Sequence, residues 1–488
     1  MFRALPFLIL NLLLVACGRA QSTSSEPEMT PTPTTDSAIP SPAASPSADA
    51  AVPEAAAFAG QWDGTINIAG TQLAIMVKIR PAGGSLSATI DIPQQGVVDL
   101  PLDGVSQNGD AIQFAIASAG AAFDGSLDGE TIRGEFTQSG AAGTFELQRT
   151  AELGELPAAP PTPELPYTAT EVTWPLADTK MAATLTIPEG DGPFPAVVFV
   201  AGSGPTDRDW NSPLLPGRNG SAALLADELT RAGYATLRYD KRVTGPYAQE
   251  NLAALQGKIS FQSHLDELIS AVDYLAAQPG IDPAQIYVLA NSEGTLHALN
   301  YQVSDPAIPF AGMILTGAPG RPLTGVLHQQ IEQILAGEPN SDELLAKWDE
   351  AVAAFLAGDT AELDPALPDS VRQVWAGLTA PLNQPFSAEL LAAQPAELLA
   401  RITVPVLVMI GKKDIQVDWQ ADGRVLQAAA GDNVTFSFPP DANHVLKHEE
   451  KSAAELTAAE AASYNAADRV LDPQALQTIL NWLAEQSG

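Results

Sequence analysis

Ile286-Tyr287-Val288-Leu289-Ala290-Asn291-Ser292-Glu293-Gly294 is the segment that indicates the fold of this chain most clearly. It begins as a continuous apolar run, which is typical of a strand covered on both faces, and residues 295–301 continue as a helical run. A serine hydroxyl stands clear of the backbone on a sharp strand-to-helix turn only if the residues two before and two after it are small. Ala290 and Gly294 meet this requirement. The common form has glycine at both places, so Ala290 departs from it. The stretch predicts a nucleophile at Ser292; an ordinary helix-capping serine is the alternative.

Seven more candidate strands surround this turn, and the central ones are also continuous apolar runs. Helical patterns lie between them: residues 265–275 show helical spacing, and Asp472-Pro473 has the form of a helix N-terminus. Alternating strands and helices predict a mostly parallel sheet. We expect an α/β fold over residues 167–488 with eight strands, at Ala169–Trp174, Lys180–Ile187, Ala196–Ala201, Ala235–Tyr239, Ile286–Ala290, Gly312–Thr316, Val406–Ile410 and Val434–Phe438.

This alternation lapses between Gly320 and Thr403, where only helical patterns occur. The stretch is too long for a simple connection. It predicts a helical cap, at about residues 321–403, inserted after the sixth strand. A cap at this place either covers the site and shapes substrate choice or is a peripheral packing insertion.

Short runs with a period of two precede the α/β region and indicate strands with one buried face. Turn signals such as Asn108-Gly109 and Asp128-Gly129 separate them. We expect residues 58–150 to form a small antiparallel β domain, a meander or an open barrel, without an obvious catalytic cluster. The runs are Thr65–Ile68, Leu73–Ile79, Leu86–Ile92, Ile112–Phe114, Thr131–Phe136 and Thr144–Leu147.

The first residues have the pattern of an export signal. Arg3 precedes an apolar stretch that is too short to span a bilayer, and Leu14-Val15-Ala16-Cys17 resembles a bacterial lipobox, in which the cysteine is acylated. We expect a lipoprotein signal peptide at 1–16, a disordered tether at 17–57 with almost no large apolar residue, and a Pro-rich linker at 151–166. The protein would be exported and held at the membrane of the cell envelope by its lipid anchor; a soluble secreted protein with a chance cysteine is the alternative.

Composition sets further bounds. A chain of 488 residues, 45% of them hydrophobic, suits two domains with linkers. Its 58 Asp and Glu against 24 Lys and Arg give a formal charge of −34, which would repel a phosphate backbone. Nucleic acid is therefore not an expected partner, and solubility is the simplest role of the charge. Cys17 is the only cysteine, so no disulfide forms within the chain.

A serine nucleophile needs a base, and the chain has five histidines. His444 comes just after the eighth candidate strand, in a loop at the carboxyl edge of the sheet, where such sites assemble. His448 is its near neighbour and its rival. His264 and His297 fall inside helical patterns, which makes them surface or packing residues, and the fifth, His328, belongs to the cap.

The base needs an acid that fixes its tautomer. Asp414 follows the seventh candidate strand, and Asp418 is the runner-up; a solvated loop carboxylate is the plain alternative for either. When a serine nucleophile lies on a strand-turn-helix, the acid and then the histidine follow it along the chain. Ser292, Asp414 and His444 occur in this order.

An oxyanion hole would complete the set, because backbone N–H donors stabilise the charged oxygen of a tetrahedral intermediate. One donor is expected from the Glu293 N–H, directly after the nucleophile. The other is expected from the Ser203 N–H in the loop after the third strand, with the Gly204 N–H as the alternative. Asp207 and Arg208 of that loop are expected to pair with each other.

Four segments together resemble bacterial carboxylesterases of the α/β-hydrolase superfamily, near its dienelactone-hydrolase-like and prolyl-oligopeptidase-like branches. The resemblance covers about residue 167 to the C-terminus, and some relatives also carry an N-terminal β domain. It implies a Ser292–His444–Asp414 triad that acts through an acyl-enzyme on a small-molecule ester, without a metal or organic cofactor. The segments are residues 202–209, Asn291-Ser292-Glu293-Gly294, residues 411–417 and Asn443-His444.

Three hypotheses follow for the activity. The first is an esterase for short or medium acyl chains. The second is a peptidase or another acyl hydrolase, for which Glu293 could help to hold a substrate amine. The third is a non-catalytic surface lipoprotein whose β domain binds a ligand, which a complete triad argues against.

Overall fold

The computed structural model describes residues 57–487, except 69–70, 83–84, 93–96, 117–120, 139–140, 155–164, 213–217, 360–362, 453–454 and 457–468. The expected signal peptide, the tether and Cys17 lie outside the described residues, as does most of the expected linker. The chain forms two compact units, and the main boundary between them along the sequence falls near residue 161.

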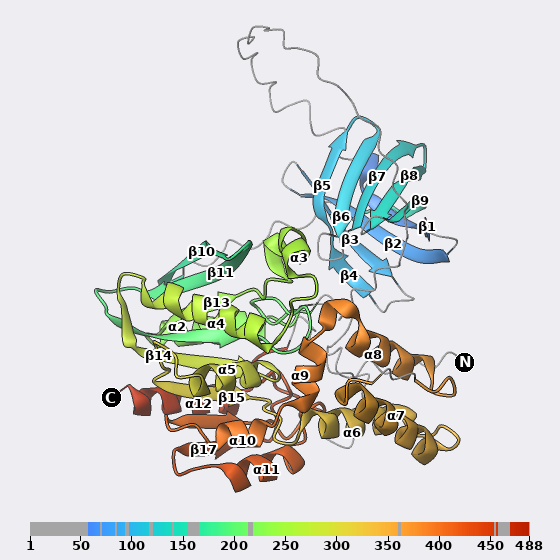
Figure 1. Ribbon diagram of the computed structural model, residues 1–488. Helices are drawn as coiled ribbons and strands as arrows, with labels where there is room; N and C mark the ends of the chain where they lie inside the picture. Colours follow the sequence, from blue (N-terminus) through green and yellow to red (C-terminus); the bar gives the residue numbers. More distant parts are fainter. Residues whose placement is uncertain are drawn as a thin grey trace, which may run out of the picture. The chain divides into compact units, whose positions relative to one another are not determined.

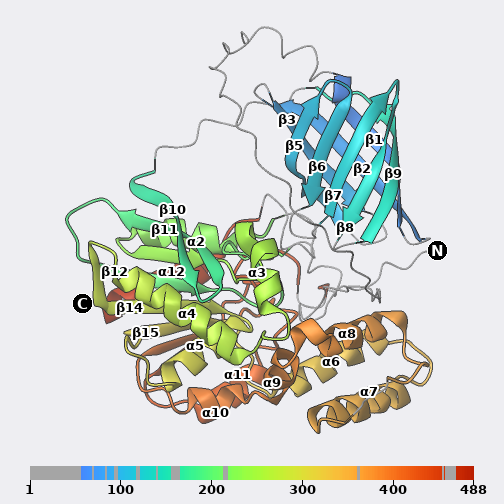
Figure 2. The same ribbon diagram turned by 45° about the horizontal axis from the view of Figure 1, so that its top comes forward.

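The first unit is a nine-stranded antiparallel sheet whose order is β4-β3-β2-β1-β9-β8-β7-β6-β5. Its two ends approach each other, since the N–H of Leu102, between β4 and β5, donates to the Ala88 carbonyl of β3 at 2.9 Å. The sheet is therefore barrel-like (Figure 2), as expected for a small all-β domain. The strands are β1 Gly60–Ile68, β2 Thr71–Ala82, β3 Ser85–Ile92, β4 Val97–Pro101, β5 Asp103–Asn108, β6 Ala111–Ile116, β7 Ala121–Asp128, β8 Thr131–Gln138 and β9 Ala141–Ala151.

The second unit is an eight-stranded sheet of order β10-β11-β13-β12-β14-β15-β16-β17 (Figure 1). The first three strands of this order pair antiparallel, and every later pairing is parallel. The prediction of an eight-stranded, mostly parallel α/β sheet is confirmed. The strands are β10 Tyr167–Leu176, β11 Thr179–Pro188, β12 Phe194–Val200, β13 Ala235–Tyr239, β14 Ile281–Asn291, β15 Gly312–Thr316, β16 Val406–Met409 and β17 Val434–Ser437.

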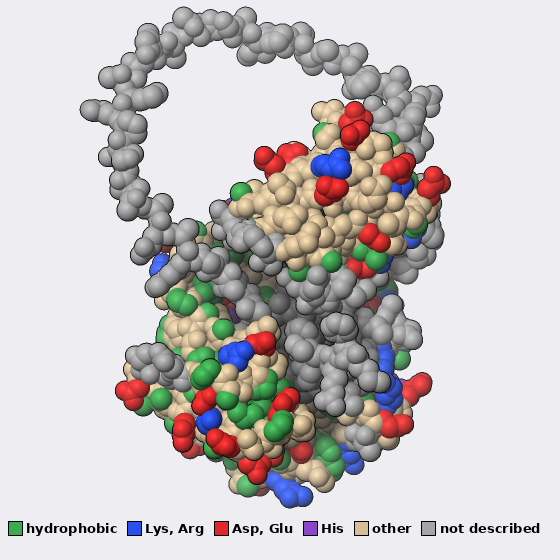
Figure 3. All heavy atoms as spheres, turned by 90° about the vertical axis from the view of Figure 1, so that its right-hand side faces the viewer, with side chains coloured by type: hydrophobic (Ala, Val, Ile, Leu, Met, Phe, Trp, Pro, Cys, Tyr) green, Lys and Arg blue, Asp and Glu red, His purple; other side chains and the backbone are tan. Residues whose placement is uncertain are grey.

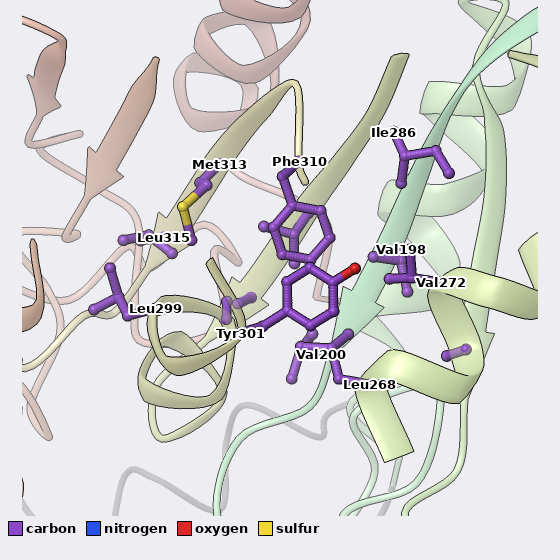
Figure 4. Packing of buried hydrophobic residues seen from close by; sticks show 14 of the residues in the cluster. Val198, Val200, Leu268, Val272, Ile286, Leu299, Tyr301, Phe310, Met313 and Leu315 are labelled. Atoms are coloured by element: carbon purple, nitrogen blue, oxygen red, sulfur yellow. The ribbon is translucent and has the colours of Figure 1, made fainter. Parts of the chain in front are cut away.

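Helices cover both faces of this sheet, which explains its apolar strands. On β12, Val198 packs with α4 and α5 (Figure 4), whereas its neighbour Val197 faces α2 and α12. The predicted start of the last helix is confirmed, because the Asp472 side chain accepts the Ala475 N–H at 2.8 Å. The helices are α2 Ser221–Arg231, η3 Gly245–Tyr247, α3 Ala248–Leu255, α4 Phe261–Ala276, α5 Gly294–Val303, α11 Ala421–Ala429 and α12 Pro473–Gln486.

A set of helices lies between β15 and β16, where the sequence predicts an insertion. These helices form a core of their own around Trp348 and Trp375. Leu296 of α5 belongs to the same core, so the insertion packs beside the helix that follows Ser292. Its elements are α6 Leu323–Leu335, α7 Ser341–Leu356, α8 Asp369–Thr379, η4 Pro381–Asn383, α9 Phe386–Ala392 and α10 Pro395–Leu399.

Charged side chains are spread over the surface seen in Figure 3 rather than gathered into one patch. This distribution fits a role of the net charge in solubility. Within the described part of the chain, no helix combines the length and the apolar character that crossing a membrane requires.

Candidate active site

Ser292 lies at the sharp turn between β14 and α5. Its φ of 54° falls in the left-handed region, which a non-glycine residue adopts at a cost of about 1–3 kcal/mol. Two contacts hold the turn: the Ser292 N–H donates to the Thr316 carbonyl of β15 at 2.8 Å, and the Thr295 hydroxyl donates to the Ser292 carbonyl at 2.6 Å. The surrounding structure thus fixes a strained serine at the carboxyl end of the central strand.

The turn also explains the small residue two positions after the serine. A β-carbon added to Gly294 would lie 2.6 Å from the Ala201 carbonyl oxygen and 2.8 Å from that of Val200. Both neighbours are backbone atoms of β12 and the loop after it, which cannot move aside cheaply. Close approach of this loop to the turn therefore requires glycine at residue 294.

Gly294→Ala is expected to destabilise the protein by about 1–3 kcal/mol, because the new methyl group forces the turn away from β12. Gly325→Ala is the matched control: Gly325 lies in α6, and a β-carbon there meets nothing within 4 Å. That change is expected to stabilise the protein by about 0.5–1 kcal/mol. Urea unfolding of both variants measures this, and equal stabilities would contradict the close approach.

His444 and Asp414 form a buried pair. The His444 Nδ1 and Asp414 Oδ2 atoms are 2.8 Å apart, with side-chain exposures of 5% and 0%. The other Asp414 oxygen accepts the N–H groups of Gln416 at 2.8 Å and Val417 at 2.9 Å. Asp414 is thereby fixed in place, and Nε2 is the ring nitrogen left for another partner.

The imidazole and the serine are brought to the same place in the fold. The Asn291 side chain, adjacent to Ser292, donates to the His444 carbonyl at 3.0 Å. A β-carbon added to Gly317 would lie 3.0 Å from both Cε1 and Nδ1 of His444, while the preceding residue, Thr316, accepts the Ser292 N–H. Ser292 contacts Thr316 at the end of β15, and His444 lies beside Gly317, the next residue, so both site residues lie at the same end of this strand.

The rival residues have other partners. His448 Nδ1 lies 3.1 Å from Asp472, the capping residue of α12. Asp418 accepts the N–H groups of Gln420 and Ala421 at 2.8 Å each, and so holds the start of α11. Neither contact belongs to the arrangement around Ser292.

The loop after β12 passes directly beside the serine, since a β-carbon added to Gly202 would lie 3.2 Å from the Ser292 Cβ. Ser203 and Glu293 are both buried. Within the described residues, the N–H groups of Ser203, Gly204 and Glu293 have no hydrogen-bond acceptor. The amides that the sequence selects for an oxyanion hole are thus available, with Gly204 still an alternative to Ser203.

The expected pairing of Asp207 with Arg208 is wrong. The Arg208 guanidinium reaches back to Asp240, at the end of β13, with Nη2 and Oδ2 2.6 Å apart. The Asp207 carboxylate instead accepts the N–H groups of Asp209 and Asn211 at 2.9 Å each. The reason is local geometry: Asp207 caps the tight turn of its own loop, while the long arginine side chain spans to the sheet.

Sequence reasoning missed a buried charged network beneath the site, and placed His264 and His297 only as surface or packing residues. His297 lies 3.2 Å from Glu293, and His264 lies 3.1 Å from Glu267. The two imidazoles also pack against each other, with ring centroids 4.7 Å apart.

The sequence carried one signal of this network, Asp240-Lys241-Arg242, three charged residues directly after a buried strand. Lys241 pairs with Glu293 at 3.0 Å and Arg242 with Glu267 at 2.9 Å.

This network shifts several pKa values. Burial lowers the pKa of His297 to about 4. Burial alone would raise the pKa of Glu267, but the charges of His264 and Arg242 lower it to about 2. In the same way, Lys241 and His297 outweigh burial and hold the pKa of Glu293 well below its usual range.

Stability is expected to fall as the pH drops. The unfolded chain protonates His297 near pH 6.5 and the folded chain only near pH 4, so the full stability is present above pH 6.5 and about 3 kcal/mol is lost on reaching pH 4. Glu267 adds a further loss as the pH falls from 4.5 toward 2. Urea midpoints between pH 7 and pH 4 measure the decline, which His297→Gln should flatten; equal slopes in both proteins would contradict this assignment.

Among the described residues, no group of three or more His, Cys, Asp or Glu side chains is arranged to hold a metal ion.

Residues 197–460 match the model of a family described as the alpha/beta hydrolase family. Esterase EstD of Thermotoga maritima is 27% identical over 265 residues, which cover 54% of this chain and 57% of that relative, so the match spans less than two thirds of the relative's length. Two solved structures are similar to this chain. Est1E from Butyrivibrio proteoclasticus with bound ferulic acid has 14% sequence identity and a TM-score of 0.38, and the match covers 64% of this chain and 98% of that chain. Proline iminopeptidase from Mycobacterium smegmatis has 17% sequence identity and a TM-score of 0.39, and the match covers 65% of this chain and 98% of that chain.

Proposed function

The chain belongs to the α/β hydrolase family, and from this premise we propose that it is a serine hydrolase that cleaves carboxylic esters through an acyl-enzyme intermediate. One observation supports the proposal: a buried His444–Asp414 pair and a serine on a strained, positive-φ turn both occur at the end of β15, next to Gly317 and Thr316 respectively. The similarity to an esterase supports ester rather than amide substrates.

The chemistry follows from these positions. The Ser292 hydroxyl attacks the acyl carbon while His444 Nε2 takes its proton. Asp414 accepts the Nδ1–H and stabilises the imidazolium that forms. The N–H groups of Ser203 and Glu293 receive the developing oxyanion. His444 then protonates the leaving alcohol, and water activated by the same ring releases the acid.

The peptidase hypothesis is less well supported. It requires the Glu293 carboxylate to hold a substrate amine. The Glu293 side chain has no exposed surface and pairs with Lys241 and His297. The carboxylate is therefore buried and already paired with cationic or imidazole partners, which leaves the N–H of this residue for the site.

A substrate panel tests the proposal. p-Nitrophenyl esters of rising chain length and aminoacyl p-nitroanilides are given to the full chain and to its Ser292→Ala variant. We expect turnover of short or medium esters, little or none of the anilides, and loss of ester turnover in the variant. Anilide hydrolysis that exceeds ester hydrolysis would replace the proposal with a peptidase, and ester turnover that the variant retains would remove Ser292 from the reaction.

We also propose that the protein is exported and anchored by lipid at Cys17. The motif Leu14-Val15-Ala16-Cys17 supports this reading. Expression with a labelled fatty acid should incorporate label into the wild-type protein and not into Cys17→Ser. Label that persists in the variant would contradict the anchor.

A further inference from the structure

Lys241 lies against the loop after β12, at residues 202–209, with almost no contact with solvent. It follows β13 by two residues, and 6% of its side chain is exposed. Its ammonium nitrogen donates to the Gly202 carbonyl at 2.6 Å and reaches the Gly204 carbonyl at 3.3 Å. The same nitrogen lies 3.0 Å from Glu293 Oε1. One buried cation thus joins the loop after β12 to the turn after β14.

These acceptors stand behind the two proposed oxyanion donors. The Gly202 carbonyl and the Ser203 N–H belong to one planar peptide group, in which a trans bond directs C=O and N–H to opposite sides. A lysine that holds the carbonyl therefore fixes the direction of the Ser203 N–H, away from the ammonium. The second donor is the N–H of Glu293, the residue whose carboxylate binds the same ammonium.

A lysine suits this place for a chemical reason. Its ammonium group carries three donors on one atom and matches the three acceptors present. A hydrogen bond at the carbonyl also polarises the peptide group, which strengthens its N–H as a donor. An apolar residue would leave the Gly202 carbonyl and the Glu293 carboxylate buried without this partner.

We infer that Lys241 is a positioning residue of the oxyanion hole: it holds the Ser203 and Glu293 amides in one fixed arrangement and so stabilises the transition state without touching the substrate. The inference rests on the proposed function, since it concerns the same site. It adds a residue that lies outside the triad and about 50 residues before the nucleophile along the chain.

The test compares Lys241→Met with Lys180→Met. Lys180 also pairs with a glutamate, Glu250 at 2.9 Å, but half of its side chain is exposed. For Lys241→Met we expect kcat for a p-nitrophenyl ester to fall about 10²-fold with little change in KM, since the donors act mainly in the transition state. Lys180→Met should behave as wild type.

A trifluoromethyl ketone separates positioning from a general loss of structure. Ser292 Oγ adds to its carbonyl carbon, the serine proton passes to His444, and the ketone oxygen becomes an oxyanion. If Lys241 positions the donors, the inhibition constant rises by the same factor by which kcat/KM falls. End-point labelling by a fluorophosphonate should still reach one group per chain, because the nucleophile is retained.

Three results would overturn the inference: Lys241→Met with kcat near wild type, a loss of kcat with an unchanged inhibition constant, or a loss of kcat that matches a loss of labelled sites.

If Lys241→Met does not fold, Glu293→Gln provides the test, because it keeps the N–H and the side-chain shape while weakening the bond to the Lys241 ammonium. We expect a loss of about tenfold in kcat and an equal rise in the inhibition constant; wild-type values would overturn the inference. A wild-type protein that cleaves neither esters nor anilides would instead overturn the proposed function.

Discussion

Ser292→Ala is expected to lower kcat for ester hydrolysis by roughly 10⁵- to 10⁶-fold, the cost of removing a serine nucleophile that acts as one unit with its base. No other group can replace the hydroxyl, because the strained turn presents this one side chain beside His444. Labelling by a fluorophosphonate should disappear with the activity. Steady-state kinetics and mass spectrometry of the labelled protein measure the two losses independently.

Ser304→Ala provides the matched control. Ser304 caps the other end of α5, where its hydroxyl donates to the Tyr301 carbonyl at 2.7 Å. Its removal should change stability slightly and leave kcat and labelling as in wild type. Undiminished labelling of Ser292→Ala would assign the nucleophile to a different residue.

Asp414→Asn is expected to lower kcat by roughly 10⁴-fold while the fold remains intact. The asparagine fits the same space, but its side-chain N–H donates to Nδ1. Nδ1 must then accept with its lone pair, so the proton of the neutral ring is on Nε2. The ring in that tautomer cannot take the proton of Ser292. The kcat of the purified variant, with a thermal unfolding curve to confirm its folding, measures the effect.

Asp418→Asn separates the two carboxylates of this loop. The Asp418 side chain accepts the N–H groups of Gln420 and Ala421 just before and at the start of α11, and the side-chain oxygen of asparagine can accept the same N–H groups. Its kcat should stay within about threefold of wild type, since this carboxylate does not contact the proposed base. A larger loss for Asp418→Asn than for Asp414→Asn would reverse the assignment.

Much of the α/β unit could be predicted from local sequence. Strands covered on both faces are continuous apolar runs. Each of the eight expected strands overlaps one strand of the sheet, and none extends beyond its C-terminal end by more than one residue. The turn at Ser292 was predictable for a similar reason, because a steric requirement fixes the size of Gly294. The carboxyl ends of neighbouring parallel strands meet at one edge, which brings Asp414 and His444 together across 30 residues.

The missed elements lack such a local signal. β5 has no buried position, so no apolar alternation marks it. β7 alternates, but its buried positions include alanine and glycine as well as Phe123, which weakens the pattern. Both strands are specified by their neighbours in the barrel-like sheet rather than by their own composition.

The buried network was missed because its partners are distant in sequence. Lys241 and Glu293 are 52 residues apart, and a charged residue after a strand usually indicates a solvated loop. This lysine is turned inward by its contacts with the loop after β12 and with Glu293. Predicting that contact requires the tertiary structure.

A crystal structure of the fluorophosphonate adduct would show directly whether the proposed residues act together. We expect phosphorus bonded to Ser292 Oγ, with the phosphoryl oxygen about 2.7–3.1 Å from the N–H groups of Ser203 and Glu293. We also expect His444 Nε2 within about 2.6–3.2 Å of an oxygen of the adduct. Phosphorus on another side chain, or an imidazole turned away from the adduct, would rule out the proposed site.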